Sequence, residues 1–229
     1  MRRCIFIILL SGFIELSYSQ GSGIGYQLDL GGSWYNQECP DYRQSIRTIT
    51  HNGFIRFHNQ SGNNAVKLMI GYRTDTIPFK NYSSFLVPDN LSMMHYSTNA
   101  YIKRNAWRFA AINQFQFGQK PGRFLFSVNT GLFYERNIRA RRSSIDDDYV
   151  YVLHEEIIKN NLGVIAGGEL RIFWFTVGIK YEKLIRDILN HDFILSQELN
   201  TTNSTELRGL KLNPGMFFIH LGVNIDFFD

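Results

Sequence analysis

The closing residues of the chain, Phe217–Asp229 (FFIHLGVNIDFFD), decide the fold because apolar and polar residues alternate along them. Every second residue is apolar: Phe217, Ile219, Leu221, Val223, Ile225 and Phe227. The interleaved residues include His220, Gly222, Asn224 and Asp226. A period of two predicts a β-strand with one apolar and one polar face. A soluble protein would turn the apolar face inward to a core, whereas a membrane barrel would turn it outward to lipid.

The same period recurs in seven earlier segments of the chain. They cover residues 25–34, 45–58, 65–74, 107–117, 124–134, 162–172 and 175–185. The weakest is 45–58, in which Ile46 and Phe54 are out of phase, so we expect a β-bulge near Asn52-Gly53. With the closing strand, these segments predict an all-β chain of eight strands.

The connections between these strands alternate in length. Short connections at 59–64, 118–123 and 173–174 alternate with long polar ones at 78–100, 136–160 and 187–213. The first connection, 35–44, is intermediate. This alternation is typical of membrane barrels, which have short turns at one end and long loops at the other. A soluble lipocalin-type barrel has less reason to show it, so we predict an eight-stranded antiparallel transmembrane up-and-down β-barrel.

The polar face of the predicted strands is rich in glycine and in charges of both signs. Its acidic residues are Asp29, Glu135, Glu169, Glu182 and Asp226, and its basic residues are Lys67, Arg73, Arg108, Arg171 and Lys180. Repeated glycines indicate a crowded, curved interior. Since an eight-stranded barrel is only wide enough for its own side chains, we expect these charges to pair inside it and to leave no open pore.

The amino terminus predicts export. Arg2 and Arg3 precede an apolar run, Cys4–Ile14, and a small-x-small cleavage site, Ser17–Ser19. We therefore expect a signal peptide at 1–19 and a single barrel domain at 20–229. After cleavage the chain has 22 basic and 19 acidic residues and one cysteine, Cys39. A net charge of +3 does not indicate nucleic-acid binding, and one cysteine cannot form an intramolecular disulfide.

Four residues of the last strand resemble the carboxy-terminal signal that the barrel-assembly machinery recognises in outer-membrane proteins. They are His220, Gly222, Ile225 and Phe227. The family pattern ends at the aromatic residue, whereas Phe228 and Asp229 follow here. The resemblance implies insertion into a bacterial outer membrane, with outer-membrane lipid and the assembly machinery as partners.

Residues 160–229 resemble the late part of PorT-like outer-membrane β-barrels of Bacteroidota-type bacteria. The resemblance rests on a glycine-rich strand (Gly163–Leu170), a tight turn, a second strand (Thr176–Ile188) and the terminal LGVNIDF stretch. It implies an outer-membrane location. The namesake of this family is linked to type IX protein secretion, so an envelope or secretion protein becomes a candidate partner.

Several residues could in principle form a catalytic or metal site, but a role as turn or surface residues explains them more simply. His58 and Ser61 lie at a predicted turn without a nearby carboxylate in the sequence, and Asp146–Asp148 match no calcium-loop spacing. Further loop candidates are His154, Glu155, Glu156, His191 and Asp192. We read all of these as surface or turn residues, and we expect no catalytic, metal or cofactor site.

Arg139, Arg141 and Arg142 form a basic cluster in a predicted outer loop. Arginine binds phosphate through charge-assisted hydrogen bonds, so this cluster is a candidate contact for lipopolysaccharide. The sequence favours a non-enzymatic barrel that serves as a structural or binding component of the envelope. Two alternatives stay open: a lipid-modifying barrel enzyme and a secreted lipocalin-like carrier of an apolar ligand.

Overall fold

The structure is a computed structural model. It describes residues 19–33, 47–59, 63–87, 92–118, 124–144, 150–153, 157–188, 190 and 215–227. Side chains are described for a smaller set: 22–32, 47–59, 63–76, 102–118, 124–141, 157–188, 190 and 215–227. Residues 1–18 lie outside the described part, so the signal peptide stays a prediction.

Nine strands form the described structure. They are β1 (Ser19–Ser33), β2 (Arg47–Asn59), β3 (Asn64–Val87), β4 (Ser92–Gly118), β5 (Phe124–Ser144), β6 (Val150–Leu153), β7 (Asn160–Ile172), β8 (Phe175–Leu184) and β9 (Gly215–Phe227). Among the described residues there is no helix long and apolar enough to cross a membrane.

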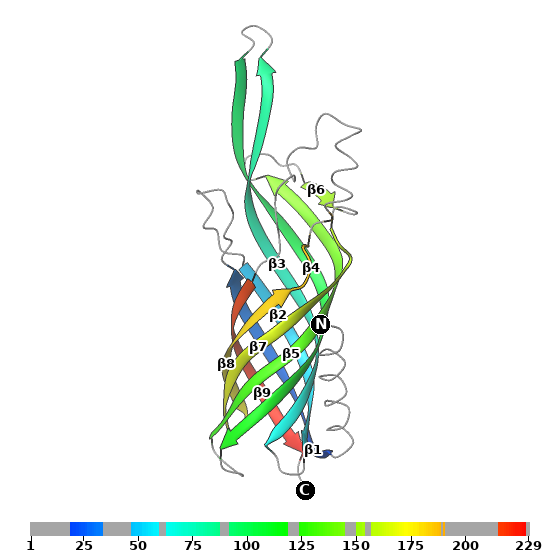
Figure 1. The fold of residues 1–229 in the computed structure, drawn as a ribbon, viewed down its shortest axis with the longest axis vertical. Helices are drawn as coiled ribbons and strands as arrows, with labels where there is room; N and C mark the ends of the chain where they lie inside the picture. The colour runs from blue at the N-terminus through cyan, green and yellow to red at the C-terminus, as the bar shows by residue number, and fades with distance from the viewer. Residues whose placement is uncertain are drawn as a thin grey trace.

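Eight of these strands close into a barrel. Each pairs antiparallel with its neighbours in the order β1-β2-β3-β4-β5-β7-β8-β9, and β9 pairs with β1 to close the ring. The short β6 pairs only with the end of β5 and stands outside the ring. The predicted eight-stranded antiparallel up-and-down barrel is therefore confirmed (Figure 1).

The two ends of the barrel differ as the connection lengths predict. The strand ends that the connections 60–63, 119–123 and 173–174 join lie at the end of the barrel where β1 starts and β9 finishes, which we call the turn end. The opposite end, the loop end, carries a long hairpin of β3 and β4 that rises beyond the ring (Figure 1). The hairpin is paired as far as Val87 and Ser92, so it is a continuation of two barrel strands.

The barrel is apolar outside and charged inside. On β9 the outward residues Leu221, Val223 and Ile225 are 51%, 44% and 55% exposed. Glu169 and Lys180, which point inward, are each only 4% exposed. A soluble barrel would show the reverse arrangement, and transmembrane barrels turn their apolar face to lipid. The predicted orientation is confirmed.

The height of the apolar wall matches a bilayer. The outward run extends from Trp107 to Phe117 on β4, from Phe124 to Tyr134 on β5 and from Phe217 to Phe227 on β9. Ten residues at ~3.4 Å each, tilted by about 40°, rise about 26 Å, close to the apolar band of roughly 25 Å on outer-membrane barrels. Asn113 and its cross-strand partner Thr130 are polar interruptions of this wall.

Aromatic side chains mark both edges of this wall. Near the loop end, Tyr72 meets Trp107 edge to face with ring centroids 5.6 Å apart, and Tyr181 lies 4.9 Å from Phe217. Near the turn end the exposed aromatics include Phe117, Phe124, Phe126, Phe173, Trp174, Phe175 and Phe227. Such girdles sit at the two membrane interfaces. Trp34, at the end of the first predicted strand, lies outside the described residues.

The predicted bulge in β2 is wrong. The strand pairs with β1 and β3 through Asn52-Gly53 without a shift of register. Phe54 is out of phase because it points into the lumen, where it is 6% exposed. The pairing of β4 with β5 does shift, between Asn105 and Ala106.

At the loop end, several strands also extend further than the sequence predicts. The expected loops at 78–100 and 136–160 contain the hairpin of β3 and β4, the end of β5 and all of β6. Beyond the bilayer both faces of a strand meet water, so alternation no longer marks it. Pro78, which pairs with Tyr101 on β4, adds a residue that normally argues against a strand.

Candidate functional site

The lumen is filled by a continuous network of ion pairs. Its centre is Glu182, whose carboxylate accepts hydrogen bonds from Arg73 and Arg108, the latter over 2.5 Å. Lys180 bridges Glu182 and Asp29, with Nζ–O distances of 2.7 Å and 2.6 Å. These residues come from β1, β3, β4 and β8, so the network ties together strands that are far apart in the sequence.

The network extends from Glu182 towards the loop end. Arg73 also binds Glu135 on β5, and Glu135 lies 3.2 Å from Arg104 on β4. Arg104 in turn donates to Asp75 on β3. Asp75 and Arg104 lie beyond the strand ends that the sequence predicts, which is why the sequence analysis missed them.

A second centre, Glu169 on β7, lies closer to the turn end. It accepts hydrogen bonds from Arg56 at 3.0 Å and from Gln114 at 2.8 Å, and Lys67 Nζ lies 3.4 Å away. Lys67 also donates to Gln27 over 2.6 Å, and Gln27 donates to Asp29, which joins the two centres. Arg56 was missed because its strand has the least regular alternation.

Charges of opposite sign nearly balance in the deep lumen. Its buried cations are Arg56, Lys67, Arg73, Arg104, Arg108 and Lys180, and its buried carboxylates are Asp29, Asp75, Glu135, Glu169 and Glu182. Ion pores are lined instead by rings of charge of one sign or by carbonyls. A nearly neutral, interlocked set of side chains occupies the described lumen, as expected for a barrel of eight strands, so the predicted pairing of these charges is confirmed.

Three phenylalanines share the lumen with these charges, each directly opposite a glycine. Phe54 pairs with Gly25, Phe133 with Gly163, and Phe218 with Gly31. A Cβ atom on any of these glycines would collide with the facing ring. The glycines therefore make room for aromatic rings, and His220 occupies the space over Gly178 in the same way.

The rings in turn support the cations. Lys67 Nζ lies 4.1 Å from the centroid of Phe54, Arg108 Cζ lies 4.9 Å from Phe133, and Arg73 Cζ lies 5.1 Å from Phe218. Cation–π contacts at these distances are attractive, more so away from water. This role is not apparent from the sequence, because Phe54, Phe133 and Phe218 break the alternation. The sequence feature that could have identified these rings is a large apolar residue on the polar face of a strand, opposite a glycine on the neighbouring strand.

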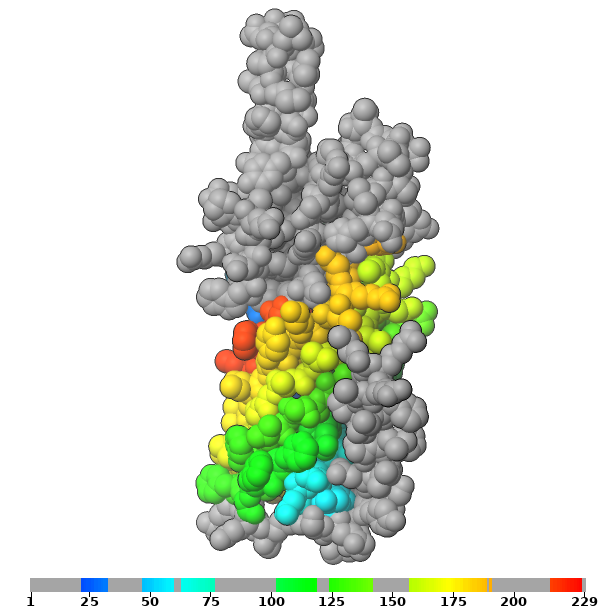
Figure 2. Space-filling model, viewed as in Figure 1, coloured from blue at the N-terminus to red at the C-terminus, as the bar shows by residue number. Residues whose placement is uncertain are grey.

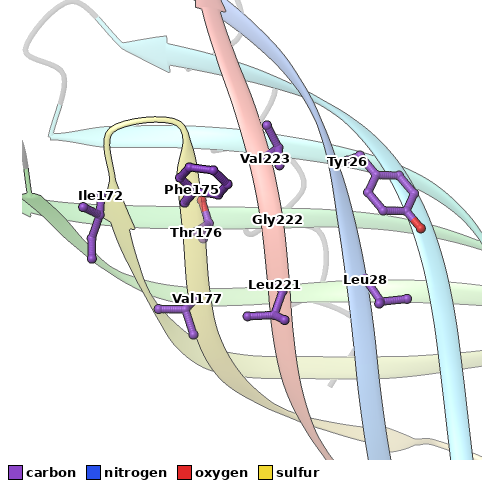
Figure 3. A pocket seen from close by; sticks show the side chains of 9 residues that line it. All are labelled: Tyr26, Leu28, Ile172, Phe175, Thr176, Val177, Leu221, Gly222 and Val223. Carbon is purple, nitrogen blue, oxygen red and sulfur yellow. The ribbon is translucent and has the colours of Figure 1, made fainter.

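The described outer wall carries an apolar groove of about 390 Å³ over β9, lined by residues of β1, β7, β8 and β9. Figure 3 shows the rings of Tyr26 and Phe175 on either side of Val223, with Leu28, Leu221 and Val177 forming the next row. Binding sites for small molecules add a few convergent polar groups to such a surface. The lining contains no charged side chain, so the groove is suited to a lipid acyl chain. Figure 2 shows another face of the barrel, which the side chains of β5, β7 and β8 cover (green to orange).

Of the predicted catalytic and metal candidates, only His58 lies among the described residues. His58 faces the lumen, with Nε2 3.8 Å from Asp226 Oδ1, so the fold supplies a carboxylate that the sequence did not indicate. His58 is 3% exposed and is enclosed by the barrel. Ser61, Asp146–Asp148, His154–Glu156, His191 and Asp192 lie outside the described residues, as does Cys39. Within the described part of the chain, acidic, histidine and cysteine residues form no group that could hold a metal ion.

The predicted contact residues lie on strands. Arg139, Arg141 and Arg142 belong to β5, so their assignment to a loop is wrong. Arg139 is exposed, Arg141 is half-buried, and the side chain of Arg142 lies outside the described ones. In the predicted assembly signal, His220 and Gly222 face the lumen, whereas Ile225 and Phe227 face outward and are each 55% exposed.

No family model and no curated protein sequence matches the chain, so the resemblance to PorT-like barrels stays a prediction. Among solved structures, the chain is similar to Ail, the attachment invasion locus protein of Yersinia pestis, solved in complex with the heparin analogue sucrose octasulfate. That pair is 11% identical with a TM-score of 0.44, over 90% of this chain and 99% of Ail.

Two further solved structures are similar to the chain. Neisserial surface protein A is 11% identical with a TM-score of 0.42, over 90% of this chain and 97% of its own. The amino-terminal β-barrel domain of Pseudomonas aeruginosa OprF is 12% identical with a TM-score of 0.35, over 89% and 97%.

Proposed function

We propose that the protein is a non-enzymatic outer-membrane β-barrel that anchors a binding surface at its loop end. The observation that carries this proposal is the inverted barrel: an apolar wall about as tall as a bilayer surrounds a lumen sealed by ion pairs. Such a body can span a membrane, and side chains fill its described lumen. Closed barrels of this kind belong to bacterial outer membranes, and the predicted signal peptide and terminal assembly signal support the same location.

The binding surface is centred on the hairpin formed by the ends of β3 and β4. Its backbone ladder continues from Thr76 and Lys103 to Val87 and Ser92, so it projects beyond the ring as a paired element (Figure 1). Ligand-binding residues commonly lie on projections held by a rigid scaffold. The resemblance to PorT-like barrels makes an envelope or secretion protein the partner to test first.

The two alternatives have less support from the described residues. A lipid-modifying enzyme needs its base at the lipid interface, but His58 is enclosed in the lumen near the turn end. A carrier of apolar ligands needs an apolar interior, whereas the described lumen is occupied by charged side chains.

The test begins with membrane fractionation of cells that express the full chain. We expect the protein in the outer-membrane fraction, resistant to carbonate extraction and faster in gel migration before heating than after it. Release by carbonate, or recovery from the culture supernatant, would contradict the proposal.

The binding role is tested by crosslinking in intact cells. In a matched variant, an Asn-Gly turn replaces residues 79–100 and shortens the hairpin without touching the described lumen. We expect the same folded barrel with its crosslinked partner lost. A partner that persists would place the binding surface elsewhere.

A further inference from the structure

The end of β5 turns its basic residues outward through a β-bulge. Asn105 on β4 pairs with Arg139, but the next residue, Ala106, pairs with Asn137. Ile138 is therefore the extra residue of β5 and is 53% exposed. A bulge of one residue reverses the face on which all later side chains lie.

This reversal decides where two arginines point. Before the bulge, Phe133 and Glu135 face the lumen, and a regular strand would send Arg139 and Arg141 there as well. After it, Ala140 is the lumen residue, 2% exposed. The bulge thus keeps two cations out of a lumen that has no surplus of carboxylates to pair with them, where their burial would be costly.

The result is a patch of four outward cations: Lys103 on β4, and Arg136, Arg139 and Arg141 on β5. Arg141 is the direct cross-strand partner of Lys103, and Arg136 is the partner of Trp107. Like charges in facing positions on neighbouring strands repel one another. None of the four forms an ion pair with another described residue, so an external anion would relieve this repulsion.

The height of the patch fits the headgroup layer of a membrane. Trp107 belongs to the aromatic girdle at the loop end, and Arg136 lies level with it. Lys103 is four residues further along β4, which places it about 10 Å above the girdle for a strand tilted by about 40°. The polar layer of a bilayer is roughly 5–8 Å deep on each side, so Arg136 and Arg139 lie within it, and Lys103 and Arg141 lie at its outer edge.

We propose that this patch binds the phosphate groups of lipopolysaccharide in the outer leaflet. The choice of the outer leaflet rests on the proposed outer-membrane location. The choice of phosphate as the ligand rests on the geometry of the patch. Arginine fits phosphate through paired charge-assisted hydrogen bonds, while Ile138 and Trp107 supply apolar surface for the adjoining acyl chains. The predicted contact of Arg139 and Arg141 thereby becomes part of a strand-borne site that includes Lys103 and Arg136.

The test is a titration of the folded full-length protein in neutral detergent with diphosphoryl lipid A. The variant K103Q/R139Q/R141Q is compared with R47Q/K183Q/R186Q, which removes three exposed loop-end cations from β2 and from β8 and the residues just after it. We expect the patch variant to bind on the order of 100-fold more weakly and the control variant about threefold more weakly or less. Fully dephosphorylated lipid A should bind equally to both variants and to the unmodified protein.

Heat-modifiable gel migration verifies that each variant is folded. Should the triple variant fail to fold, R139Q/R141Q is used instead, with an expected loss on the order of tenfold. If the patch and control variants lost equal affinity for lipid A, general surface charge would explain the binding, and the proposal would be overturned. Unchanged binding by the patch variant would overturn it too. Because the titration needs no cell, its outcome is independent of the fractionation that tests the proposed location.

Discussion

The lumen and the outer wall are built from alternate residues of the same strands, yet they follow opposite rules. On β8 the wall residue Ile179 is 68% exposed, whereas its neighbours Lys180 and Glu182 are almost fully buried. The wall needs only to be apolar, since lipid accepts any apolar surface. The lumen needs specific partners, because each buried charge is costly without one. Substitutions should therefore be tolerated on the wall if they stay apolar, and in the lumen only if partners are kept.

The largest effect is expected for Glu182→Gln. This change removes the charge that Arg73, Arg108 and Lys180 share, and leaves three buried cations around a neutral amide. Breaking a buried pair from one side costs about 3–5 kcal/mol. Denaturant unfolding in lipid vesicles measures this loss of unfolding free energy. Val177→Ala on the wall of the same strand should cost less than about 1 kcal/mol, since lipid replaces the lost contacts.

A second effect concerns depth within the wall. Leu221→Arg places a charge near the middle of the apolar band and should cost about 2–4 kcal/mol of unfolding free energy in vesicles. Phe217→Arg, on the same strand at the loop-end girdle, should cost about 0–1 kcal/mol. Equal costs at the two positions would mean that the wall does not cross a bilayer.

A third effect concerns the glycines opposite the lumen rings. Gly163→Ala would push its methyl group into Phe133 and should cost about 1–3 kcal/mol through overpacking. Gly53→Ala is the control, because no atom lies within 4 Å of the added Cβ, and it should be neutral or stabilising by about 0.5–1 kcal/mol. The double variant G163A/F133L should recover part of the loss. No coupling between the two positions in a double-mutant cycle would refute the pairing of ring and glycine.

Phe227→Ala should have the smallest effect on stability. Its effect on assembly in cells should be clear. Phe227 is outward-facing at the end of β9, so its loss should change unfolding in vesicles by less than about 1 kcal/mol. If the assembly machinery reads this residue, the folded fraction in cells should fall while spontaneous refolding of purified protein stays normal. A parallel loss in both settings would assign Phe227 a structural role only.

The sequence predicts the membrane-spanning part of the fold well because lipid on one side and charges on the other enforce alternation. Ten charged residues assigned to the polar face, from Asp29 to Asp226, all point away from lipid in the structure. The continuation of β3, β4 and β5 beyond the girdle was not predicted, since water on both faces removes the pattern. Arg104 and Asp75 were missed for the same reason.

Partners within the lumen could not be predicted from the sequence. Arg73 and Glu182 are 109 residues apart, and their contact depends on the closure of the ring and on the tilt of its strands. Likewise, the opposition of Phe133 and Gly163 appears only once the register is known. The one extra residue at Ile138 turns Arg139 and Arg141 to the outer face of the barrel, and the alternation in the sequence does not indicate this bulge.

The most direct test of the inverted barrel is site-directed spin labelling of β9 in vesicles. Single cysteines replace Phe217, Ile219, Leu221 and Val223 in turn, in a background in which Cys4 and Cys39 are serine. We expect labels at Leu221 and Val223 to collide often with oxygen, which dissolves in lipid, and rarely with a water-soluble nickel complex. Collision with oxygen should decline towards Phe217 at the girdle. Labels at Leu221 and Val223 that are shielded from oxygen, or open to the nickel complex, would contradict the inverted barrel.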